Sequence, residues 1–338
     1  MANYTGIQGQ NILIVSSDPS NPTEGQIWYN STTNLLKGYA NVVTNAWATG
    51  GTMNTARDAL AGCGIQTAAL VFGGFAAGDN STATEKYNGT SWTSNPTGLN
   101  TARRNISGFG IQTAAIAAGG ASPGGNSNAA ESYNGSTWTS VNNMNTARGR
   151  LAAANNSPQT AGLIFAGNSG SLSAATESWN GTSWTSVNSM NTARNWPGGL
   201  GIQTAALAFG GNNYAGGGLT PTVYSATESW NGTSWTTVNS LNVARYYPGG
   251  TGTQTAGLAF GGSGTGPSSG PFPNQNVTEL WNGTSWTASN VMATARSGMA
   301  SAGTQNAGLG AGGYTTTAVT NTEEWTGTAV AVRTITVS

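Results

Sequence analysis

The sequence predicts an all-β fold made of repeated four-stranded units. Three observations support this prediction: a six-fold internal repeat, short apolar runs that end in Gly-Gly, and Asn-Gly turns flanked by aromatic residues. No segment keeps a 3.6-residue hydrophobic period long enough to indicate a helix. The arginines of successive repeats are spaced by 46, 45, 46, 51 and 51 residues, a period typical of radial or stacked arrays of one supersecondary unit.

The first half of each repeat predicts two strands. It begins with N-T-A-R or a close variant, passes through a Gly- and Ala-rich stretch, and reaches an apolar run such as residues 68–72. Short apolar runs bounded by glycine are typical of buried strands. We therefore expect strand a directly after the arginine and strand b before the Gly-Gly.

The second half of each repeat predicts a hairpin. Residues 87–92 place Tyr87 and Trp92 around Asn88-Gly89, and the pattern recurs in the later repeats. Asn-Gly adopts the positive φ angles of a tight hairpin turn at low cost. Strand c then ends at the first aromatic residue and strand d carries the tryptophan. Four-stranded units with this period are typical of β-propeller blades, where the repeated indole packs between neighbours.

The repeats also resemble the kelch family. The second full copy carries the family order of Gly119-Gly120, Tyr133, Trp138, Met144 and Arg148. The resemblance covers residues 53–338 in six copies and implies a kelch-like β-propeller. Two copies depart from the pattern, since the third has Ala166-Gly167 for Gly-Gly and the last has Val330 where tryptophan is expected.

Residues 1–50 differ from the repeats. Residues 18–39 resemble a segment common in tail-fibre and other virion proteins of bacteriophages, while Tyr39 and Trp47 imitate the aromatic pair of a blade. We favour seven blades, with residues 27–29 as strand b of the first; the alternative is six blades plus a separate N-terminal attachment element. The expected domains are 1–50 and 51–338. A closing strand is expected from residues 12–15 or 334–338, because a propeller must remove its exposed edges.

Composition excludes several classes of function. The 338 residues carry a formal net charge of zero and only 7% are charged, so binding driven by nucleic-acid phosphates is not expected. The absence of histidine and the single Cys63 exclude an internal disulfide and a His/Cys metal cluster, and no cofactor is expected. No secretion signal or apolar run of membrane-spanning length is present, so we expect synthesis in the host cytoplasm without membrane insertion.

The repeated charges predict structural ion pairs. Each repeat supplies one arginine and one glutamate at fixed spacing, which favours buried pairs over an anion-binding ring. The members are Arg57, Arg103, Arg148, Arg194, Arg245 and Arg296, with Glu85, Glu131, Glu177, Glu228, Glu279 and Glu323.

Ligand binding is expected on one face of the propeller. The b–c and d–a connections emerge there, and the b–c loops vary in length, with the longest at residues 212–224 and 263–276. Variable loops on a rigid scaffold commonly carry recognition. Alternatively, Trp196, Tyr246 and Tyr247 only fill the central opening. The candidate ligand-binding residues are Trp196, Tyr214, Tyr224, Tyr246, Tyr247, Phe272 and Asn274.

These features predict a non-enzymatic bacteriophage virion protein, a tail fibre or other surface appendage. It would assemble with other virion proteins and dock non-covalently to a host surface glycan or protein, with many weak sites acting together. Homo-oligomerisation is left open. A bacterial surface lectin or adhesin and an architectural virion protein without ligand are the alternatives. Catalysis is disfavoured because no histidine and few acidic residues outside the repeated series are present.

Overall fold

The described residues form strands, turns and loops in two compact units. A computed structural model describes residues 12–214, 222–264 and 273–335. One unit contains residues 1–45 and 326–338, and the larger unit contains residues 46–325. This division differs from the expected boundary at residue 50, because both ends of the chain contribute to the smaller unit.

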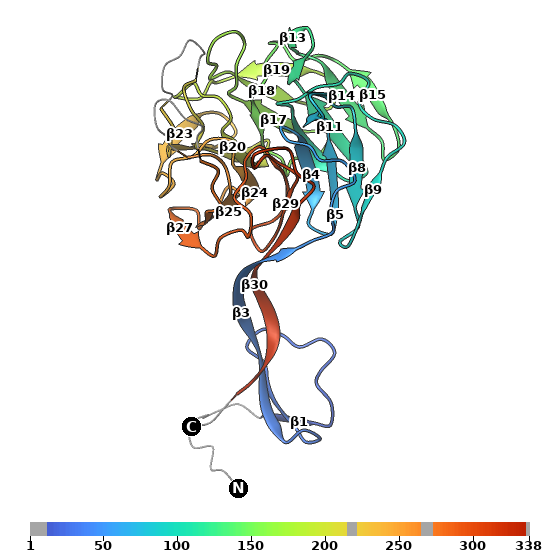
Figure 1. The fold of residues 1–338 in the computed structure, drawn as a ribbon. Coiled ribbons are helices and arrows are strands. Elements are labelled where there is room, and N and C mark those ends of the chain that lie inside the picture. The colour runs from blue at the N-terminus through green and yellow to red at the C-terminus, as the bar shows by residue number, and fades with distance from the viewer. Residues whose placement is uncertain (1–11, 215–221, 265–272, 336–338) are drawn as a thin grey trace. The chain divides into compact units, whose positions relative to one another are not determined.

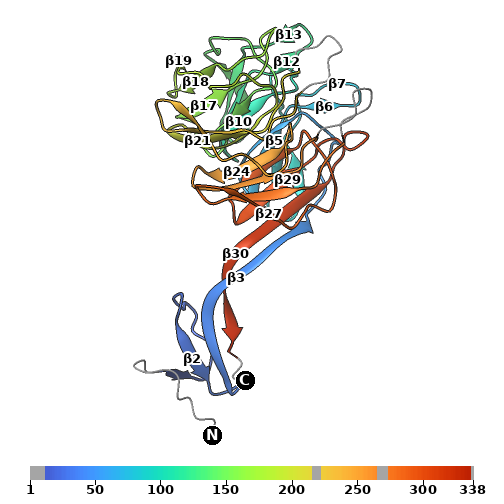
Figure 2. The same cartoon turned by 90° about the vertical axis from the view of Figure 1, so that its left-hand side faces the viewer.

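The larger unit contains five separate four-stranded antiparallel sheets (Figures 1 and 2). In the first, β4 (Ala61–Ile65), β5 (Ala68–Phe72), β8 (Thr84–Tyr87) and β9 (Trp92–Ser94) pair in sequence order. The other four sheets are β10 (Ser107–Ile111), β11 (Ala114–Ala118), β14 (Ala130–Tyr133) and β15 (Trp138–Val141); β16 (Ala152–Ala153), β17 (Gly162–Phe165), β18 (Thr176–Trp179) and β19 (Trp184–Val187); β20 (Gly198–Ile202), β21 (Ala205–Phe209), β22 (Thr227–Trp230) and β23 (Trp235–Val238); and β24 (Gly249–Thr253), β25 (Ala256–Phe260), β26 (Thr278–Trp281) and β27 (Trp286–Ser289). Two short hairpins extend b–c loops: β6 (Phe75–Ala76) with β7 (Asp79–Asn80), and β12 (Ala121–Ser122) with β13 (Gly125–Asn126).

The sixth blade combines the two ends of the repeat array. Its strands are β28 (Ala300–Gly303), β29 (Ala307–Ala311), β30 (Thr322–Thr334) and, on the outside, β3 (Leu35–Thr49). Both views show β3 and β30 side by side (Figures 1 and 2). The N-terminal segment therefore supplies strand d of the last blade. This explains why the last repeat has Val330 at the position where tryptophan is expected.

Trp47 on β3 makes the contacts of the missing tryptophan. Its ring centroid lies 5.4 Å from that of Trp325 on the same blade and 5.0 Å from that of Phe260 on the preceding blade. Its indole donates a 2.9 Å hydrogen bond to Oγ1 of Thr278. In the second blade, Trp138 donates to Thr84 in the same way. Trp47 is thus the sixth member of the series, whereas Tyr39 lies in the smaller unit.

The inner strands complete a ring. Contacts link β4, β10, β16, β20, β24 and β28 in order, and β28 packs against β4. Figure 1 shows the red end of the array beside its blue start. These contacts confirm the predicted all-β propeller. The described residues form six blades, so the favoured seventh blade is wrong: residues 27–29 pair within the smaller unit instead of forming a strand b.

A repeated glutamine joins each blade to the one before it. Nε2 of Gln112 in the second blade donates to the carbonyls of Ala69 and Tyr87 in the first, at 3.1 and 2.6 Å. The first blade bonds to the sixth in the same way, since Gln66 donates to Gly308 and Trp325 at 3.0 and 2.8 Å. The other members of the series are Gln159, Gln203, Gln254 and Gln305.

The Asn-Gly hairpins differ in detail from the expected turn. Only Gly89 has a positive φ, of 90°, and the amide of Asn88 donates to the carbonyl of Ser91 at 3.2 Å. Oδ1 of Asn88 accepts bonds from the amides of Thr90 and Ser91 at 2.9 and 2.8 Å. Glycine thus supplies the positive φ of the turn, and the asparagine side chain caps it as in an Asx turn.

The smaller unit is built on β2 (Ile27–Asn30), which pairs with β1 (Leu13–Val15) in parallel and with β3 in antiparallel register. Asp18 is hydrogen bonded by Trp28, Asn30 and Lys37. The segments expected to close the propeller also lie here: residues 13–15 form β1, and the amide of Ile335 bonds to Leu36. Residues 336–338 of the second expected clasp lie outside the described residues.

Candidate functional site

The six repeated ion pairs are buried inside single blades. Each arginine and its glutamate are at most 4% exposed. The nitrogen–oxygen distances are 2.8 Å for Arg57–Glu85, 2.7 Å for Arg103–Glu131, 2.8 Å for Arg148–Glu177, 2.8 Å for Arg245–Glu279 and 3.3 Å for Arg296–Glu323, and Arg194 pairs with Glu228.

The surroundings of each pair explain the N-T-A-R motif. In the first blade, Nη1 of Arg57 donates to the carbonyls of Gly73 and Ala83 at 2.8 and 2.7 Å. Oε2 of Glu85 accepts the amide of Asn54 at 2.7 Å. Burial lowers the pKa of Arg57, and the charge of Glu85 opposes that effect. The pair therefore fastens the d–a connection to strands b and c, and it is inaccessible to a ligand.

The b–c loops and the d–a connections lie on one face, which we call the loop face. The residue after each repeated arginine pairs with the start of the b–c loop of its own blade. The bridges are Asp58–Phe75, Arg104–Ala121, Gly149–Asn168, Asn195–Asn212, Tyr246–Ser263 and Ser297–Tyr314.

The next residue of each blade forms a closed ring of six backbone hydrogen bonds at the centre of the loop face. We call it the central ring, and all six members have positive φ angles between 48° and 62°. Each amide donates to the preceding member, at distances from 2.7 to 3.1 Å, and Ala59 donates to Gly298 to complete the circuit. The members are Ala59, Asn105, Arg150, Trp196, Tyr247 and Gly298.

Two aromatic members of the central ring share one acceptor. Nε1 of Trp196 and the hydroxyl of Tyr247 each donate to Oδ1 of Asn105 at 3.0 Å. The rings of Trp196 and Tyr247 are stacked, with centroids 5.7 Å apart, and the ring of Tyr246 is tilted against that of Trp196, also with centroids 5.7 Å apart. Their side chains are partly exposed. The structure thus places three of the predicted residues together over the centre.

Two arginines outside the repeated series stack on aromatic rings here. The guanidinium carbon of Arg104 lies 4.5 Å from the ring centroid of Phe75, and that of Arg150 lies 4.4 Å from Trp196. Burial lowers the pKa of Arg150, and nearby Arg104 lowers it further. Burial raises the pKa of Asp58, while the charge of Arg104 partly opposes the rise. The centre therefore combines two cations, one carboxyl group and aromatic surfaces.

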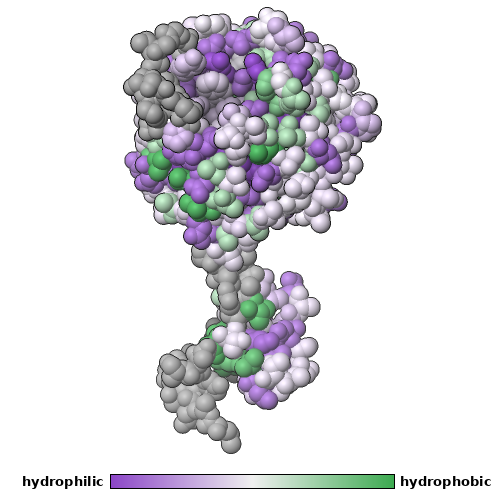
Figure 3. All heavy atoms as spheres, in the orientation of Figure 1, coloured by the Kyte–Doolittle hydropathy of each residue, from purple (hydrophilic) through white to green (hydrophobic). Residues whose placement is uncertain are grey.

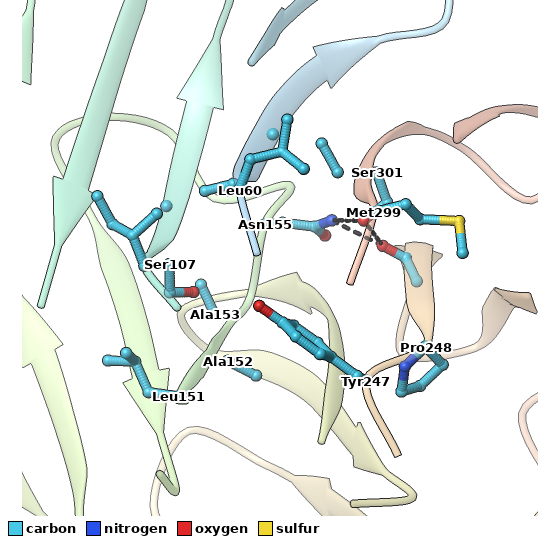
Figure 4. A pocket seen from close by; sticks show the side chains of 18 of the residues that line it. Leu60, Ser107, Leu151, Ala152, Ala153, Asn155, Tyr247, Pro248, Met299 and Ser301 are labelled. Atoms are coloured by element: carbon cyan, nitrogen blue, oxygen red, sulfur yellow. Dashed lines mark hydrogen bonds between the residues drawn. The ribbon is translucent and has the colours of Figure 1, made fainter. Parts of the chain in front are cut away.

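Below the central ring lies a cavity of about 80 Å³ between the inner strands (Figure 4). Tyr247 extends over it, and burial raises the pKa of its hydroxyl well above 10. Asn155 enters from the third blade, where its Nδ2 donates to the carbonyl of Gly250 at 2.7 Å and to Oγ of Ser301 at 3.4 Å. Tyr247 and Asn155 both line the cavity, which has room for water-sized molecules.

A larger groove of about 670 Å³ opens on the loop face between the fifth and sixth blades. Tyr246 and Tyr314 are its aromatic lining, and Asn274, Ser297 and Thr315 contribute polar groups. A volume in this range suits a small ligand. Because Tyr246 also contacts Trp196, the groove continues the aromatic surface of the centre.

The remaining predicted residues have different positions. Tyr214 is 36% exposed and its carbonyl accepts Nδ2 of Asn195 at 2.5 Å. Tyr224 covers buried Arg194, with 5.7 Å between guanidinium carbon and ring centroid. Asn274 donates to the carbonyls of Tyr314 and Thr315 at 2.9 and 2.7 Å, so it ties two loops together. Phe272 lies outside the described residues.

Arg104, Asn105 and Arg150 are not among the site residues predicted from the sequence. A signal was present, because Arg104 and Arg150 are the two arginines of the propeller that do not open a repeat. Each follows a repeated arginine by one or two positions. Among residues 12–214, 222–264 and 273–335, no group of His, Cys, Asp or Glu could hold a metal ion. Within the same ranges, no helix is long and apolar enough to cross a membrane.

The fold defines the class of protein as an all-β propeller. No family model and no curated protein matches the chain. Among solved structures, YjhT is similar to it, with a TM-score of 0.66 and 13% sequence identity. The match covers 83% of this chain and 99% of YjhT. At this identity the similarity supports the propeller architecture alone.

Proposed function

We propose that the chain is a kelch-like propeller of a bacteriophage particle that docks to a host surface glycan or protein through its loop face. The observation that carries the docking proposal is the distribution of exposed chemistry. Six arginine–glutamate pairs are buried, whereas Arg104, Arg150 and the aromatic rings of Trp196 and Tyr246 remain partly accessible at one centre. Aromatic residues and arginine are enriched where proteins recognise partners.

The virion proposal has a separate basis. Residues 18–39 resemble a virion-protein segment, and β2 and the start of β3, within these residues, belong to the smaller unit. That unit supplies the attachment element in the proposal, while the propeller supplies the docking surface. Many copies on one particle would convert weak single contacts into stable adsorption.

A purely architectural virion role is the second candidate. It is favoured by Asn105, which accepts the polar hydrogens of both Trp196 and Tyr247 within the protein. This internal bonding stabilises the centre of the ring without any ligand.

Two measurements on particles test the proposal. Antibody against the chain should label a surface appendage in electron micrographs, and purified full-length chain should reduce particle adsorption to host cells in proportion to its concentration. Labelling without inhibition of adsorption would favour the architectural role. Absence of the chain from particles, together with binding of the chain to cells, would favour a bacterial surface lectin.

A further inference from the structure

Two arginines of the propeller, Arg104 and Arg150, form no ion pair with the described residues. Among the described residues, no Asp or Glu oxygen lies within 4.0 Å of a guanidinium nitrogen of Arg104 or Arg150. The segments outside the description contain no Asp or Glu. An acidic side chain outside the described ranges therefore cannot pair with Arg104 or Arg150, whereas each of the six repeated arginines has its glutamate.

Stacking holds both guanidinium groups in place while leaving their edges available. Phe75 covers one face of Arg104, and Trp196 covers one face of Arg150. A planar guanidinium stacked on a ring still presents N–H groups at its edge, and this fork matches carboxylate and phosphate oxygens. Neither group donates a side-chain hydrogen bond to the described part of the chain, unlike the repeated arginines.

The charges of the two arginines act on each other. Partial burial is the main cause that lowers the pKa of Arg150, Tyr214 and Tyr247 oppose that effect, and the charge of Arg104 adds a smaller lowering. In the described part of the chain, the carboxyl group of Asp58 interacts with the charge of Arg104, and burial raises the pKa of Asp58. Like charges in a partly desolvated place repel more strongly than in water. An anion from outside the chain would relieve that repulsion.

Flat apolar surfaces adjoin the cations. Trp196 lies under Arg150 and contacts Tyr246, and Tyr246 lines the 670 Å³ groove that leads to Tyr314. Aromatic rings beside hydrogen-bonding groups suit the alternating apolar and hydroxylated faces of sugar rings. Ser297 and Thr315 add polar groups to the groove. A ligand that binds there therefore needs both apolar and polar surfaces.

We propose that the loop-face centre binds a saccharide that carries a carboxylate or phosphate group, with Arg104 and Arg150 on the anion and Trp196 and Tyr246 against the sugar. This inference rests on the proposed docking function and specifies its ligand class. The anion is the shared chemistry, and both acidic sugars and phosphorylated glycans supply it.

Binding of defined probes to purified full-length chain tests the proposal. The probes are immobilised oligogalacturonate, its carboxyl-reduced neutral counterpart, and a glycerol-phosphate polymer bearing sugars. We expect at least tenfold tighter binding to one of the two anionic probes than to the neutral one, and which anionic probe binds distinguishes carboxylate from phosphate. Equal binding to the neutral probe, or no binding to any probe, would overturn the inference.

Matched variants locate the effect. The double variant Arg104→Gln/Arg150→Gln should lose at least tenfold in affinity for the anionic probe, whereas Arg104→Lys/Arg150→Lys should retain part of it. Lys86→Gln removes a cation that instead bonds to the carbonyl of Gly135, and this control should bind like the wild type. An unchanged thermal midpoint shows that the variants are folded.

The same variants separate this inference from the docking proposal. If the glutamine variant binds host cells as well as the wild type does, the two arginines do not recognise an anion on the host. The inferred ligand class is then wrong, while the docking proposal still holds. If the wild-type chain fails to bind host cells at all, the docking proposal itself is wrong.

Discussion

Nε1 of Trp47 donates a 2.9 Å hydrogen bond to Oγ1 of Thr278, and this contact joins the N-terminal strand to the fifth blade. Thr278 stands where Thr84 and Thr176 accept Trp138 and Trp235 in other blades. A residue 231 positions away in sequence thus completes the sixth repeat. Because both ends of the chain contribute strands to the sixth blade, the ring is closed and the open edge of a linear array is removed.

Replacement of Trp47 by alanine should destabilise the whole propeller. The change removes a large ring from its contacts with Phe260 and Trp325. Because Trp47 is only partly buried, we expect a cost of about 2–4 kcal/mol, slightly below the ~3–5 kcal/mol of fully buried aromatics. The denaturation midpoint measures the effect, with Trp286→Ala as the matched variant inside the array. A wild-type midpoint for Trp47→Ala would show that the ring does not depend on β3.

Breaking one buried ion pair should cost more than replacing both partners. Arg148→Met leaves Glu177 buried without its cation, and we expect a loss of about 3–5 kcal/mol. The double variant Arg148→Met/Glu177→Leu should recover most of that loss, because no charge then remains unpaired. Equilibrium unfolding of the wild type, both single variants and the double variant gives the coupling free energy. Additive losses would contradict a direct interaction.

The shared acceptor at the centre of the loop face can be tested by Asn105→Ala. This change leaves Trp196 and Tyr247 without a partner for their polar hydrogens, at a cost of about 1–3 kcal/mol. Alanine accepts the positive φ of this position, as Ala59 does in the same ring. Asn105→Asp keeps an acceptor and serves as the control. Equal midpoints for the wild type and Asn105→Ala would exclude a stabilising role for these bonds.

The smaller unit should lose stability in acid through Asp18. Hydrogen bonds from Lys37, Asn30 and Trp28 lower the pKa of Asp18 from 3.8 to about 2. A carboxyl group with a lowered folded-state pKa contributes its stabilisation above the unfolded pKa, so the contribution is complete above about pH 4 and disappears as the pH falls towards 2. The Trp28 indole N–H resonance should report a midpoint near pH 2. Asp18→Asn should abolish this titration, whereas a midpoint near 4 would show that the bonds do not hold the carboxylate.

Much of the propeller could be predicted from periodicity alone. Strands a to d follow from the Gly-Gly ends, the Asn-Gly turns and the tryptophans, because each marks a local backbone requirement. The blade count could not be obtained in this way. Trp47 looks like part of an additional N-terminal repeat in sequence, and only the pairing of β3 with β30 shows that it completes the last one.

The centre of the loop face was partly predictable. Trp196, Tyr246 and Tyr247 follow repeated arginines directly, so their clustering follows from the repeat. The role of Asn105 was not predictable. Its side-chain oxygen accepts hydrogen bonds from Trp196 and Tyr247, which lie 91 and 142 positions away in the sequence. We considered two roles for these aromatic residues, to fill the central opening and to bind a ligand. The two roles are compatible, because stacked rings can do both.

The most direct test of the account is which face of the propeller binds host cells. Fluorescently labelled full-length chain would be compared with Tyr246→Ser/Tyr314→Ser on the loop face and with Ile65→Ser/Ile202→Ser at the a–b turns of the opposite face. Ile65, Ile202 and Tyr314 are 53%, 43% and 43% exposed, and Tyr246 is partly exposed, so both pairs remove accessible apolar groups. We predict that the tyrosine variant loses at least tenfold in cell binding while the isoleucine variant binds normally. Normal binding by the tyrosine variant and loss of binding by the isoleucine variant would contradict the account.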